Sequence, residues 1–322
     1  MPELPEVEIL CRRLDEYCGG RRVARAELAS ISALKTFEPP LRSLTGRVID
    51  SCSRRGKYIC FKLCSGGAAS LPPAEQAPPA AGDAGSPASP AAGRVLPAAA
   101  PIWLVIHLAR GGWIKWRRQL TPAPARPGKG PLALRVGLEG GDGFDVTEMG
   151  TEKRLAIWVV PSPEDVEGIA TLGPEPLAAD FTVDRLAAIL SAEKGDLKHV
   201  LSRQSIIAGV GNAYSDEALH AAGLSPFKQA ARLSPDELAR LYAALNLVLT
   251  EAVERAAPLD LDELKDGKRQ GMRVHGRTGS ACPVCGDTVR EVSFATRSLQ
   301  YCPTCQTGGK PLADRRLSRL LK

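Results

Sequence analysis

The first residues of the chain carry the strongest candidate for covalent chemistry. The chain begins Met1-Pro2-Glu3, and a small second residue favours removal of the initiator methionine, which would leave Pro2 with a free secondary amine. An α-amino group titrates at about pH 7.7–8.0, so it is a far better nucleophile at neutral pH than a lysine. Attack of this amine on a sugar C1′ gives a cationic iminium, and the neighbouring Glu3 carboxyl can move protons. The residues alone leave open that the Pro-Glu pair has no chemical role.

A second cluster, near the C-terminus, has the spacing of a metal site. It consists of two CxxC pairs separated by sixteen residues, Cys282 with Cys285 and Cys302 with Cys305. Each pair can turn two thiolates onto one ion, and four thiolates complete a tetrahedral zinc site. Because all four ligands are cysteines, the pattern predicts one closed, structural Zn²⁺. A redox-active dithiol is the alternative.

Two glycine-containing turns could place polar groups beside an anion. The turn Arg54-Arg55-Gly56-Lys57 separates two β-rich runs, so the Lys57 ammonium could be held close to a strand; a charged surface hairpin is the alternative. The turn Gly209-Val210-Gly211-Asn212 precedes a helical pattern, and exposed N–H groups at a helix N-terminus suit a phosphate. Glycine turns between helices are also common without any ligand.

The spacing of apolar residues predicts an α+β multidomain fold around these groups. Residues 4–18 have helical spacing, and Gly19-Gly20 ends the helix, whose positive dipole end would lie close to Pro2. Many short strands without intervening helices then predict a β-sandwich, and the second half of the chain is helical. The expected strands are 48–52, 58–63, 102–108, 113–116, 132–138, 143–147 and 155–160, and the expected helices are 184–192, 197–203, 213–222 and 235–256.

Composition places the boundaries between the expected domains. Residues 66–101 are rich in Ala, Pro, Gly and Ser and cannot bury a core, so they are expected to form a disordered insertion in a hairpin. The expected division is a β-sandwich domain at 1–160, a Pro- and Gly-containing linker at 161–180, a helical domain at 181–264, a zinc-binding domain at 265–309 and a basic tail at 310–322.

Charge and cysteine usage narrow the class of protein. The 322-residue chain has a net charge of +6, and from Lys265 to Lys322 it carries 12 Lys or Arg against four Asp or Glu. That imbalance suggests a polyanionic partner, although a solvated charged face is the alternative. The five N-terminal cysteines have no ligand-like spacing, no apolar segment resembles a signal peptide, and none is long enough to span a membrane. A cytosolic, reducing compartment is expected.

Together these motifs resemble the formamidopyrimidine-DNA glycosylase/endonuclease VIII family. The resemblance covers nearly the whole chain apart from the insertion and the tail. It implies an N-terminal β-sandwich with one N-terminal helix, a helix–two-turn–helix domain and a C-terminal zinc-ribbon β-hairpin, with double-stranded DNA in the cleft between the halves. It also implies a monomer that associates with a bacterial-type nucleoid in the cytoplasm. The motifs that carry it are residues 2–8, the 54–57 turn, the run Leu172-Gly173-Pro174-Glu175-Pro176-Leu177, the 209–212 turn and the paired CxxC.

The resemblance implies a bifunctional DNA glycosylase/AP lyase of base excision repair. Pro2 would attack C1′ of the damaged nucleotide, and Glu3, supported by Glu6, would protonate the opening sugar. Lys57 would contact phosphate and donate the proton in β-elimination, while Arg297 would grip phosphate and serve δ-elimination. Such contacts position a lesion without reading sequence, and the base must leave the stack to be reached. The residues implied at the DNA are Lys57, His107, Arg110, Lys153, Lys198, Asn212 and Arg297.

The chain departs from the family pattern where the flipped base and its partner are handled. Arg110 stands where the family often has the Met that fills the hole left by the flipped base. Lys153 stands where an Arg pairs with the orphan base, and a lysine cannot offer a planar bidentate fork. Leu155 takes the place of a wedging Phe, and the stretch Asp266–Gly276, which covers the flipped base in oxidised-guanine enzymes, is shorter here.

Three hypotheses about function follow from the sequence. The first is the glycosylase/lyase, acting on oxidised or ring-opened bases or chiefly on abasic sites, and the presence of Pro2, Glu3 and Lys57 favours it. The second is a non-catalytic protein that binds damaged DNA or abasic sites on the same scaffold. The third is a zinc-ribbon transcription accessory, which explains the C-terminus but not the first six residues.

Overall fold

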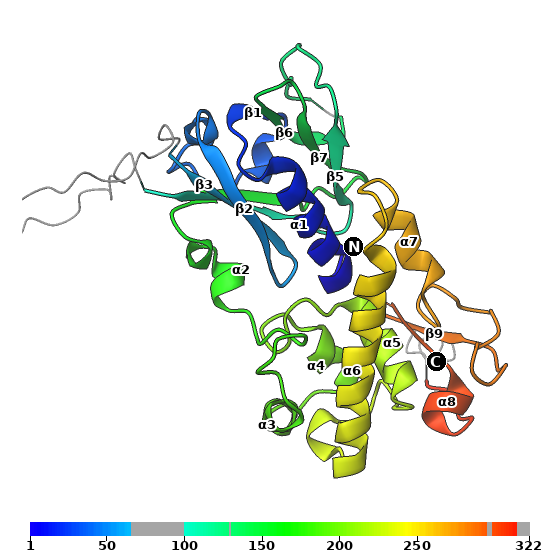
Figure 1. The fold of residues 1–322 in the computed structure, drawn as a ribbon. Helices are drawn as coiled ribbons and strands as arrows, with labels where there is room; N and C mark the ends of the chain where they lie inside the picture. Colours follow the sequence, from blue (N-terminus) through cyan, green and yellow to red (C-terminus); the bar gives the residue numbers. More distant parts are fainter. Residues whose placement is uncertain (66–99, 129, 295–297, 314–322) are drawn as a thin grey trace, which may run out of the picture.

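The computed structural model describes residues 1–65, 100–128, 130–294 and 298–313 (Figure 1). A β-sandwich lies at one end of the molecule, a group of helices at the other, and a zinc-ribbon-like hairpin beside the helices. The predicted α+β architecture is therefore confirmed. The expected insertion lies outside the described residues except for residues 100 and 101, and so do Arg297 and tail residues 314–322. No helix among the described residues is both long and apolar enough to cross a bilayer.

Helix α1 (Leu4–Cys18) has the predicted bounds and follows directly on the candidate nucleophile. A capping box fixes its start: the Glu3 side chain accepts from the backbone of Glu6, and the Glu3 N–H donates to Glu6 Oε2 at 2.8 Å. The buried side chains Val7, Leu10 and Leu14 pack into the sandwich core. The cap thus sets the direction of the first three residues of the chain.

The sandwich consists of two four-stranded antiparallel sheets. Phe61 and Phe144 stack across the interior with ring centroids 5.2 Å apart. Strand β1 lies in a stretch where the sequence indicated only short strands and turns, because most of its residues are half exposed. One sheet has the order β1 (Val23–Leu28), β6 (Leu132–Leu138), β7 (Gly143–Glu148), β5 (Gly112–Arg117), and the other has the order β2 (Val48–Arg55), β3 (Tyr58–Cys64), β4 (Ile102–His107), β8 (Ala156–Val160).

Part of the expected linker is packed structure. It forms a 3₁₀ turn η3 (Pro163–Asp165) and a short helix α2 (Glu167–Ala170). Val166 and Ile169 are buried against Cys60, Val105 and Val160 on the outer face of the second sheet. The sequence predicted only a linker here because Val166 and Ile169 are two isolated apolar residues in a segment rich in Pro and Gly. Other 3₁₀ turns are η1 (Ile31–Ala33), η2 (Leu41–Leu44) and η4 (Ala230–Arg232).

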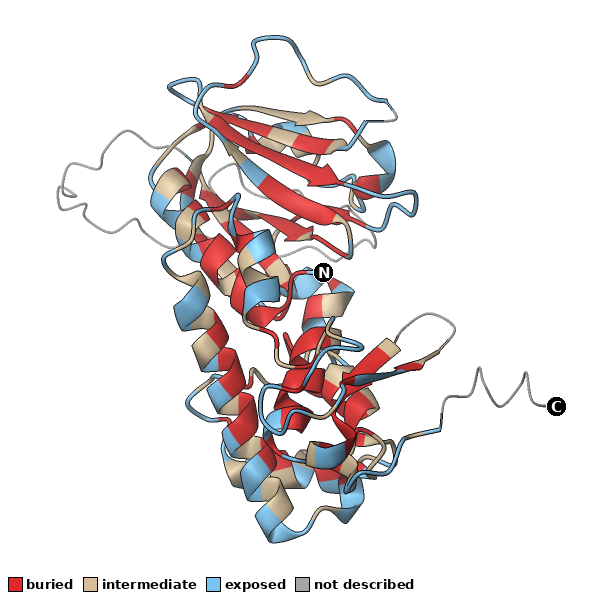
Figure 2. Ribbon diagram, turned by 90° about the vertical axis from the view of Figure 1, so that its right-hand side faces the viewer, coloured by how far each residue is buried: buried red, intermediate tan, exposed pale blue. Residues whose placement is uncertain are grey.

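The helical half shares one core, and its longest helix also reaches the sandwich. Helix α6 (Pro235–Ala256) has the predicted bounds, and a Ser234–Glu237 capping box starts it. It contacts both α1 and α5, so it runs along both halves of the molecule (Figure 1). Figure 2 shows buried residues along its inward side and exposed residues along the other. The remaining helices of this half are α3 (Val183–Ser191), α4 (Leu197–Ser202) and α5 (Asn212–Ala221).

The chain then returns to the sandwich before it forms the hairpin. Helix α7 (Leu264–Gln270) was not predicted from the sequence. Leu261 and Leu264 are buried in the sandwich core, and the Trp113 indole N–H donates to the Leu261 carbonyl at 3.0 Å. The hairpin consists of β9 (Arg290–Ser293) and β10 (Ser298–Tyr301), followed by α8 (Pro303–Thr307).

Candidate active site and metal centre

A cavity of about 880 Å³ lies where the sandwich, the helical half and the hairpin meet. It collects residues that are far apart in the sequence, and the chain's own N-terminus forms part of its wall (the N label in Figures 1 and 2). The lining includes the three residues to which the sequence assigned chemistry, together with several cations. These residues are Pro2, Glu3, Glu6, Lys57, Arg110, Trp113, Asn212, Lys265, Lys268, Arg269, His275 and Arg277.

The Glu3 carboxylate is buried at the start of helix α5. It accepts hydrogen bonds from the backbone N–H groups of Ala213 (2.9 Å) and Tyr214 (3.3 Å). Burial opposes ionisation, but the Lys268 and Lys57 ammonium groups and these two N–H groups lower the pKa of Glu3 to about 2. Glu3 is therefore a carboxylate at neutral pH.

The 209–212 turn holds the N-terminal residues in place. Gly209 has a positive φ of 79°, and its carbonyl accepts from the Leu4 N–H at 3.0 Å. Because the first N–H groups of α5 bind Glu3, the expectation that they would be offered to a phosphate is wrong for Ala213 and Tyr214. The anion at this helix N-terminus is a side chain of the protein itself.

At Gly211 the backbone lies directly against the side chains of Lys57 and Glu3. A Cβ placed there would lie 2.4 Å from the Lys57 Nζ and 2.6 Å from the Glu3 Cδ. Both side chains therefore occupy the space that any other residue at this position would need. The glycine brings the lysine and the carboxylate against the same stretch of backbone.

Lys57 is held rather than free, as the turn between two strands suggested. It is only 5% exposed, and burial lowers its pKa, with Glu3 opposing this effect and Lys268 adding to it. His107 at the end of β4 packs against the Tyr58 ring with centroids 4.8 Å apart. Burial and the Lys57 charge lower the pKa of His107 to about 4, so this histidine is neutral at pH 7.

Two predicted DNA contacts of the helical half make internal hydrogen bonds. The Asn212 side chain lines the cavity and donates to the Ser298 carbonyl at 2.8 Å, which joins α5 to the hairpin. Lys198 is only 5% exposed, and its ammonium faces the Asn212 carbonyl, the Ser215 hydroxyl and the Asp216 carboxylate at 2.5–2.8 Å. In this arrangement Lys198 supports the turn around Asn212.

The three residues that depart from the family pattern lie in three different environments. Arg110 is exposed and lines the cavity, next to Ala109 with its positive φ of 49°. The Lys153 ammonium hydrogen-bonds to the Glu148 carbonyl at the end of β7. Leu155, which stands at the position of a wedging Phe, is 2% exposed and packs within the sandwich core. Leucine fits the apolar interior here, which the sequence position could not reveal.

Lys268 is one of the cavity residues that the sequence analysis missed, and it contacts both carboxylates. Its Nζ lies 2.8 Å from Glu6 Oε2 and 3.8 Å from Glu3 Oε1. It also lies 4.8 Å from the centre of the Tyr214 ring. The only signal in the sequence was its place in a basic segment, which gives no information about partners more than 250 residues away.

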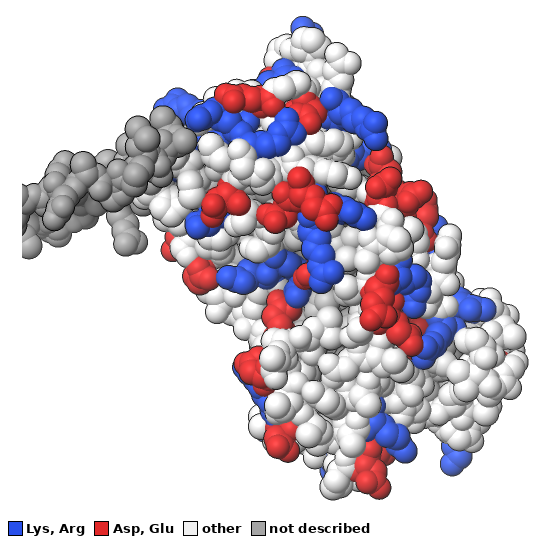
Figure 3. All heavy atoms as spheres, viewed as in Figure 1, with Lys and Arg blue, Asp and Glu red and all other residues white. Residues whose placement is uncertain are grey.

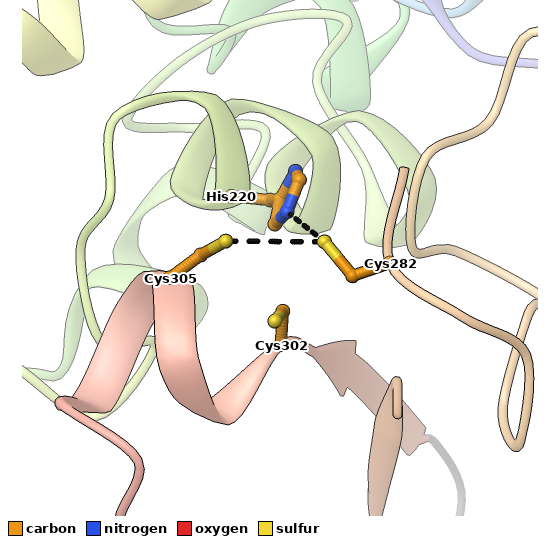
Figure 4. Close-up of side chains that lie close together, drawn as sticks. All are labelled: His220, Cys282, Cys302 and Cys305. Carbon is orange, nitrogen blue, oxygen red and sulfur yellow. Dashed lines mark hydrogen bonds between the residues drawn. The ribbon is translucent and has the colours of Figure 1, made fainter. Parts of the chain in front are cut away.

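The four cysteines converge as predicted. The Sγ atoms of Cys282 and Cys305 lie 3.8 Å apart (Figure 4). The Sγ atoms of Cys285 and Cys302 lie 3.4 Å apart. A tetrahedral zinc with Zn–S bonds of about 2.3 Å has sulfur–sulfur edges of roughly 3.8 Å. The donor set and its spacing therefore fit one structural zinc.

His220 of helix α5 also lies at this cluster. Its Nε2 is 3.3 Å from the Cys282 sulfur, and its ligand atom lies within 4.8 Å of those of Cys282, Cys302 and Cys305 (Figure 4). An imidazole N–H donated to a zinc-bound thiolate is a common outer contact of a metal site. The sequence gave no indication of it because His220 lies about 60 residues before the first CxxC.

The fold and the cavity define a class of three-part proteins, in which a β-sandwich, a helix–two-turn–helix module and a zinc ribbon meet around the chain's own N-terminus. Three domain families match the chain in this order. They are the formamidopyrimidine-DNA glycosylase N-terminal domain at residues 1–149, the formamidopyrimidine-DNA glycosylase H2TH domain at 172–259, and the zinc finger found in FPG and IleRS at 279–308. The chain belongs to the formamidopyrimidine-DNA glycosylase family, whose members are DNA glycosylases of base excision repair.

Relatives of known sequence support this assignment over the full length. The formamidopyrimidine-DNA glycosylase of Symbiobacterium thermophilum is 33% identical over 316 residues, covering 95% of this chain and 89% of the relative. An uncharacterised formamidopyrimidine-DNA glycosylase-like protein of Mycobacterium tuberculosis is 58% identical over 151 residues, which is 47% of this chain and 94% of that protein.

Solved structures show the same fold. MutM (Fpg) from Thermus thermophilus is 30% identical, with a TM-score of 0.72 over 96% of this chain and 100% of that chain. Lactococcus lactis Fpg, solved with DNA containing an abasic site, has a TM-score of 0.73 over 95% of this chain and 99% of that chain. At 23% identity, the second likeness concerns the fold alone.

Proposed function

We propose that the protein is a bifunctional DNA glycosylase/AP lyase that uses Pro2, after removal of Met1, as its nucleophile. The observation that carries this proposal is the meeting of Pro2, Glu3 and Lys57 in one cavity, with Lys57 and Glu3 both pressed against Gly211. A carboxylate and an ammonium beside a secondary amine are the groups that iminium chemistry at a sugar requires.

In the glycosylase step the Pro2 nitrogen forms a bond to C1′ of the damaged nucleotide. The bond from C1′ to the base breaks, and the base leaves with the electron pair and takes a proton from solvent. The Glu3 carboxylate, whose low pKa keeps it ionised, accepts the proton that the nitrogen loses and delivers it to O4′ as the C1′–O4′ bond opens. The product is an iminium between Pro2 and the open sugar.

In the lyase steps the iminium acidifies the hydrogens at C2′. Water takes a C2′ proton, the C3′–O3′ bond breaks, and the phosphate oxygen leaves with the electron pair and is protonated. In the second elimination water takes the C4′ proton, the C5′–O5′ bond breaks in the same way, and the other phosphate is released. Lys57 is placed beside Glu3 and is proposed to donate the proton of the first elimination. Arg297, proposed for the second, lies outside the described residues. Water then hydrolyses the remaining iminium and frees Pro2. The zinc, when bound, holds the hairpin and takes no part in these steps.

The proposed partner is double-stranded DNA carrying a damaged base or an abasic site, and we propose that a monomer binds it. Several structural neighbours were solved with such DNA. Arg110, Arg269 and Arg277 line the cavity and are proposed phosphate contacts. The face seen in Figure 3, by contrast, mixes acidic and basic side chains without a patch of one sign. A cytoplasmic location is part of this proposal, as is the division into domains at 1–160, 181–264 and 265–309.

Borohydride trapping tests the function. Borohydride reduces the iminium to a stable amine, so a covalent protein–DNA adduct reports its formation. Duplexes with an abasic site, 8-oxoguanine, a formamidopyrimidine or an oxidised pyrimidine are compared for the wild type, Pro2→Gly and Glu3→Gln. We expect an adduct with the wild type that Pro2→Gly greatly reduces, and the duplex that traps best identifies the lesion. Tight abasic-site binding without any adduct would instead identify a non-catalytic damage-binding protein.

A further inference from the structure

Lys268 is built into the reactive end of the cavity, although it comes from a helix near the C-terminus. Its Nζ is 2.8 Å from Glu6 Oε2 and 3.8 Å from Glu3 Oε1, and it donates to the Met1 carbonyl oxygen at 3.2 Å. The side chain is only 16% exposed and lies over the ring of Tyr214. A lysine with this many partners has a defined position, unlike a mobile surface lysine.

Helix α7, which carries Lys268, is fixed to the sandwich. Leu264 in its first turn is 1% exposed and belongs to the sandwich core, as does Leu261 just before the helix. The Trp113 indole holds the Leu261 carbonyl at 3.0 Å. The position of Lys268 relative to the N-terminus therefore depends on packing within the sandwich and does not require DNA.

We propose, on the basis of the proposed function, that Lys268 is a positioning residue that orients the Glu3 and Glu6 carboxylates and, by its charge, keeps the Pro2 amine in its unprotonated, nucleophilic form. The Met1 carbonyl oxygen is two bonds from the Pro2 nitrogen, so Lys268 Nζ lies within roughly 6 Å of that nitrogen. When Met1 is removed, the ammonium loses this acceptor and stands beside a free amine. A cation at that distance disfavours a second positive charge.

The charges around the N-terminal amine support this direction. Burial lowers the pKa of the Met1 amine, Lys268 lowers it further, and Lys57 adds a smaller effect of the same sign, while Glu3 and Glu6 oppose them. Tyr214 faces the same carboxylates, and burial holds its pKa well above the usual value, so it remains neutral. Of the two lysines that act on the Met1 amine, Lys268 thus has the larger effect, and the same ammonium lies close to the Pro2 nitrogen.

Lys268 also retains its own charge. Burial alone would lower the pKa of its ammonium, but Glu3 and Glu6 raise it above the ordinary value. The pKa values of Lys268 and Lys57 are therefore shifted in opposite directions, since burial lowers the pKa of Lys57. Because Lys268 is engaged with two carboxylates, it is assigned to the N-terminus rather than to a phosphate.

The direct test measures the reactivity of the Pro2 amine without DNA. Wild type, Lys268→Met, Lys268→Arg and Lys265→Met are purified, and intact mass confirms removal of Met1. Each is reductively methylated with formaldehyde and cyanoborohydride across pH 5.5–9, and the N-terminal peptide is quantified by mass spectrometry. Lys265 is the matched control, because it lines the cavity from the same helix, and among the described residues its ammonium makes no ion pair.

We expect Lys268→Met to label on the order of tenfold more slowly on the acidic side of the profile and equally on the alkaline plateau. Lys268→Arg keeps the charge and should follow the wild type, and Lys265→Met should stay within about twofold of it. If Lys268→Met does not fold, Lys268→Gln, which keeps a hydrogen bond to Glu6 but not the charge, takes its place. Identical profiles for the wild type and the uncharged variant would overturn the inference.

A second measurement separates this inference from the proposed function. The pH profile of borohydride trapping is recorded at saturating abasic DNA for the same four proteins. We expect the trapping profile of the uncharged Lys268 variant to shift to higher pH and the profiles of the other variants to follow the wild type. If the wild type labels as expected but traps no DNA, the proposed function fails and the assignment of Lys268 stands. If the uncharged variant loses DNA affinity but keeps the wild-type pH profile, Lys268 is a phosphate contact and the inference is wrong.

Discussion

Substitution of Gly211 by alanine is expected to impair catalysis far more than folding. The added Cβ would lie 2.4 Å from Lys57 Nζ, 2.6 Å from Glu3 Cδ and 2.8 Å from Glu3 Oε2. Gly211 has φ −136° and ψ −152°, which is extended backbone, so alanine is tolerated there and the conflict falls on the two side chains. Both must move by about 1 Å to restore normal contact distances.

The expected magnitude follows from that displacement. A 1 Å misplacement of reacting groups costs on the order of a hundredfold in rate, which is about 2.7 kcal/mol in the barrier. Overpacking of a tight site costs roughly 1–3 kcal/mol in the free energy of unfolding. Glu3 would also lose hydrogen-bond geometry with the N–H groups of Ala213 and Tyr214, which adds to the loss of its proton-transfer role.

Single-turnover borohydride trapping on an abasic duplex measures the rate, and thermal unfolding measures the stability. Gly195→Ala is the control, because its Cβ would make only ordinary contacts at 3.4 Å with His199 and Val200 in the same half of the molecule. We expect Gly211→Ala to trap about a hundredfold more slowly, with Gly195→Ala close to the wild type. Trapping by Gly211→Ala at the wild-type rate would refute the argument that the Lys57–Glu3 geometry limits the chemistry.

Three further predictions concern groups away from the nucleophile. Burial and the Lys57 charge lower the pKa of His107 to about 4, so as pH falls below about 6.5 the unfolded chain binds a proton before the folded one. The free energy of unfolding should therefore decrease from about pH 6.5 toward pH 4. His107→Gln should flatten this part of the stability curve, and an unchanged curve would contradict the assignment. Cys302→Ser should abolish stoichiometric zinc, measured by metal analysis, and weaken DNA binding, whereas retention of one zinc would argue against the four-cysteine site. Leu155→Ala should lower the free energy of unfolding by about 2–5 kcal/mol and leave trapping by the folded protein unchanged, and slow trapping at normal stability would restore a role at the DNA.

Local patterns allowed much of the fold to be predicted. Helices α1 and α6 have the predicted bounds because each combines a capping box with apolar residues at helical spacing, and both signals are local. The paired CxxC spacing also predicted one four-cysteine site, and the structure brings Cys282 against Cys305 and Cys285 against Cys302. The meeting of Pro2 with Lys57 needed the resemblance to a family, because these residues are placed by tertiary packing.

The parts that could not be predicted depend on partners distant in sequence. Lys268 reaches Glu6 across 262 residues, and no property of a basic segment indicates such a partner. Helix α7 is short and contains a glycine, so its own propensity is weak, and burial of Leu264 in the sandwich stabilises it. The N–H groups of α5 appeared available to a phosphate because the sequence did not show that Glu3 would occupy them.

The central claim, that the N-terminal proline is the nucleophile, is tested most directly by locating the adduct. The wild type is trapped with borohydride on an abasic duplex, digested with protease and nuclease, and analysed by tandem mass spectrometry. The account predicts that the reduced sugar remnant is attached to the nitrogen of Pro2 in a peptide that lacks Met1. A remnant on the side chain of Lys57 or Lys268, or no adduct with DNA that is tightly bound, would contradict it.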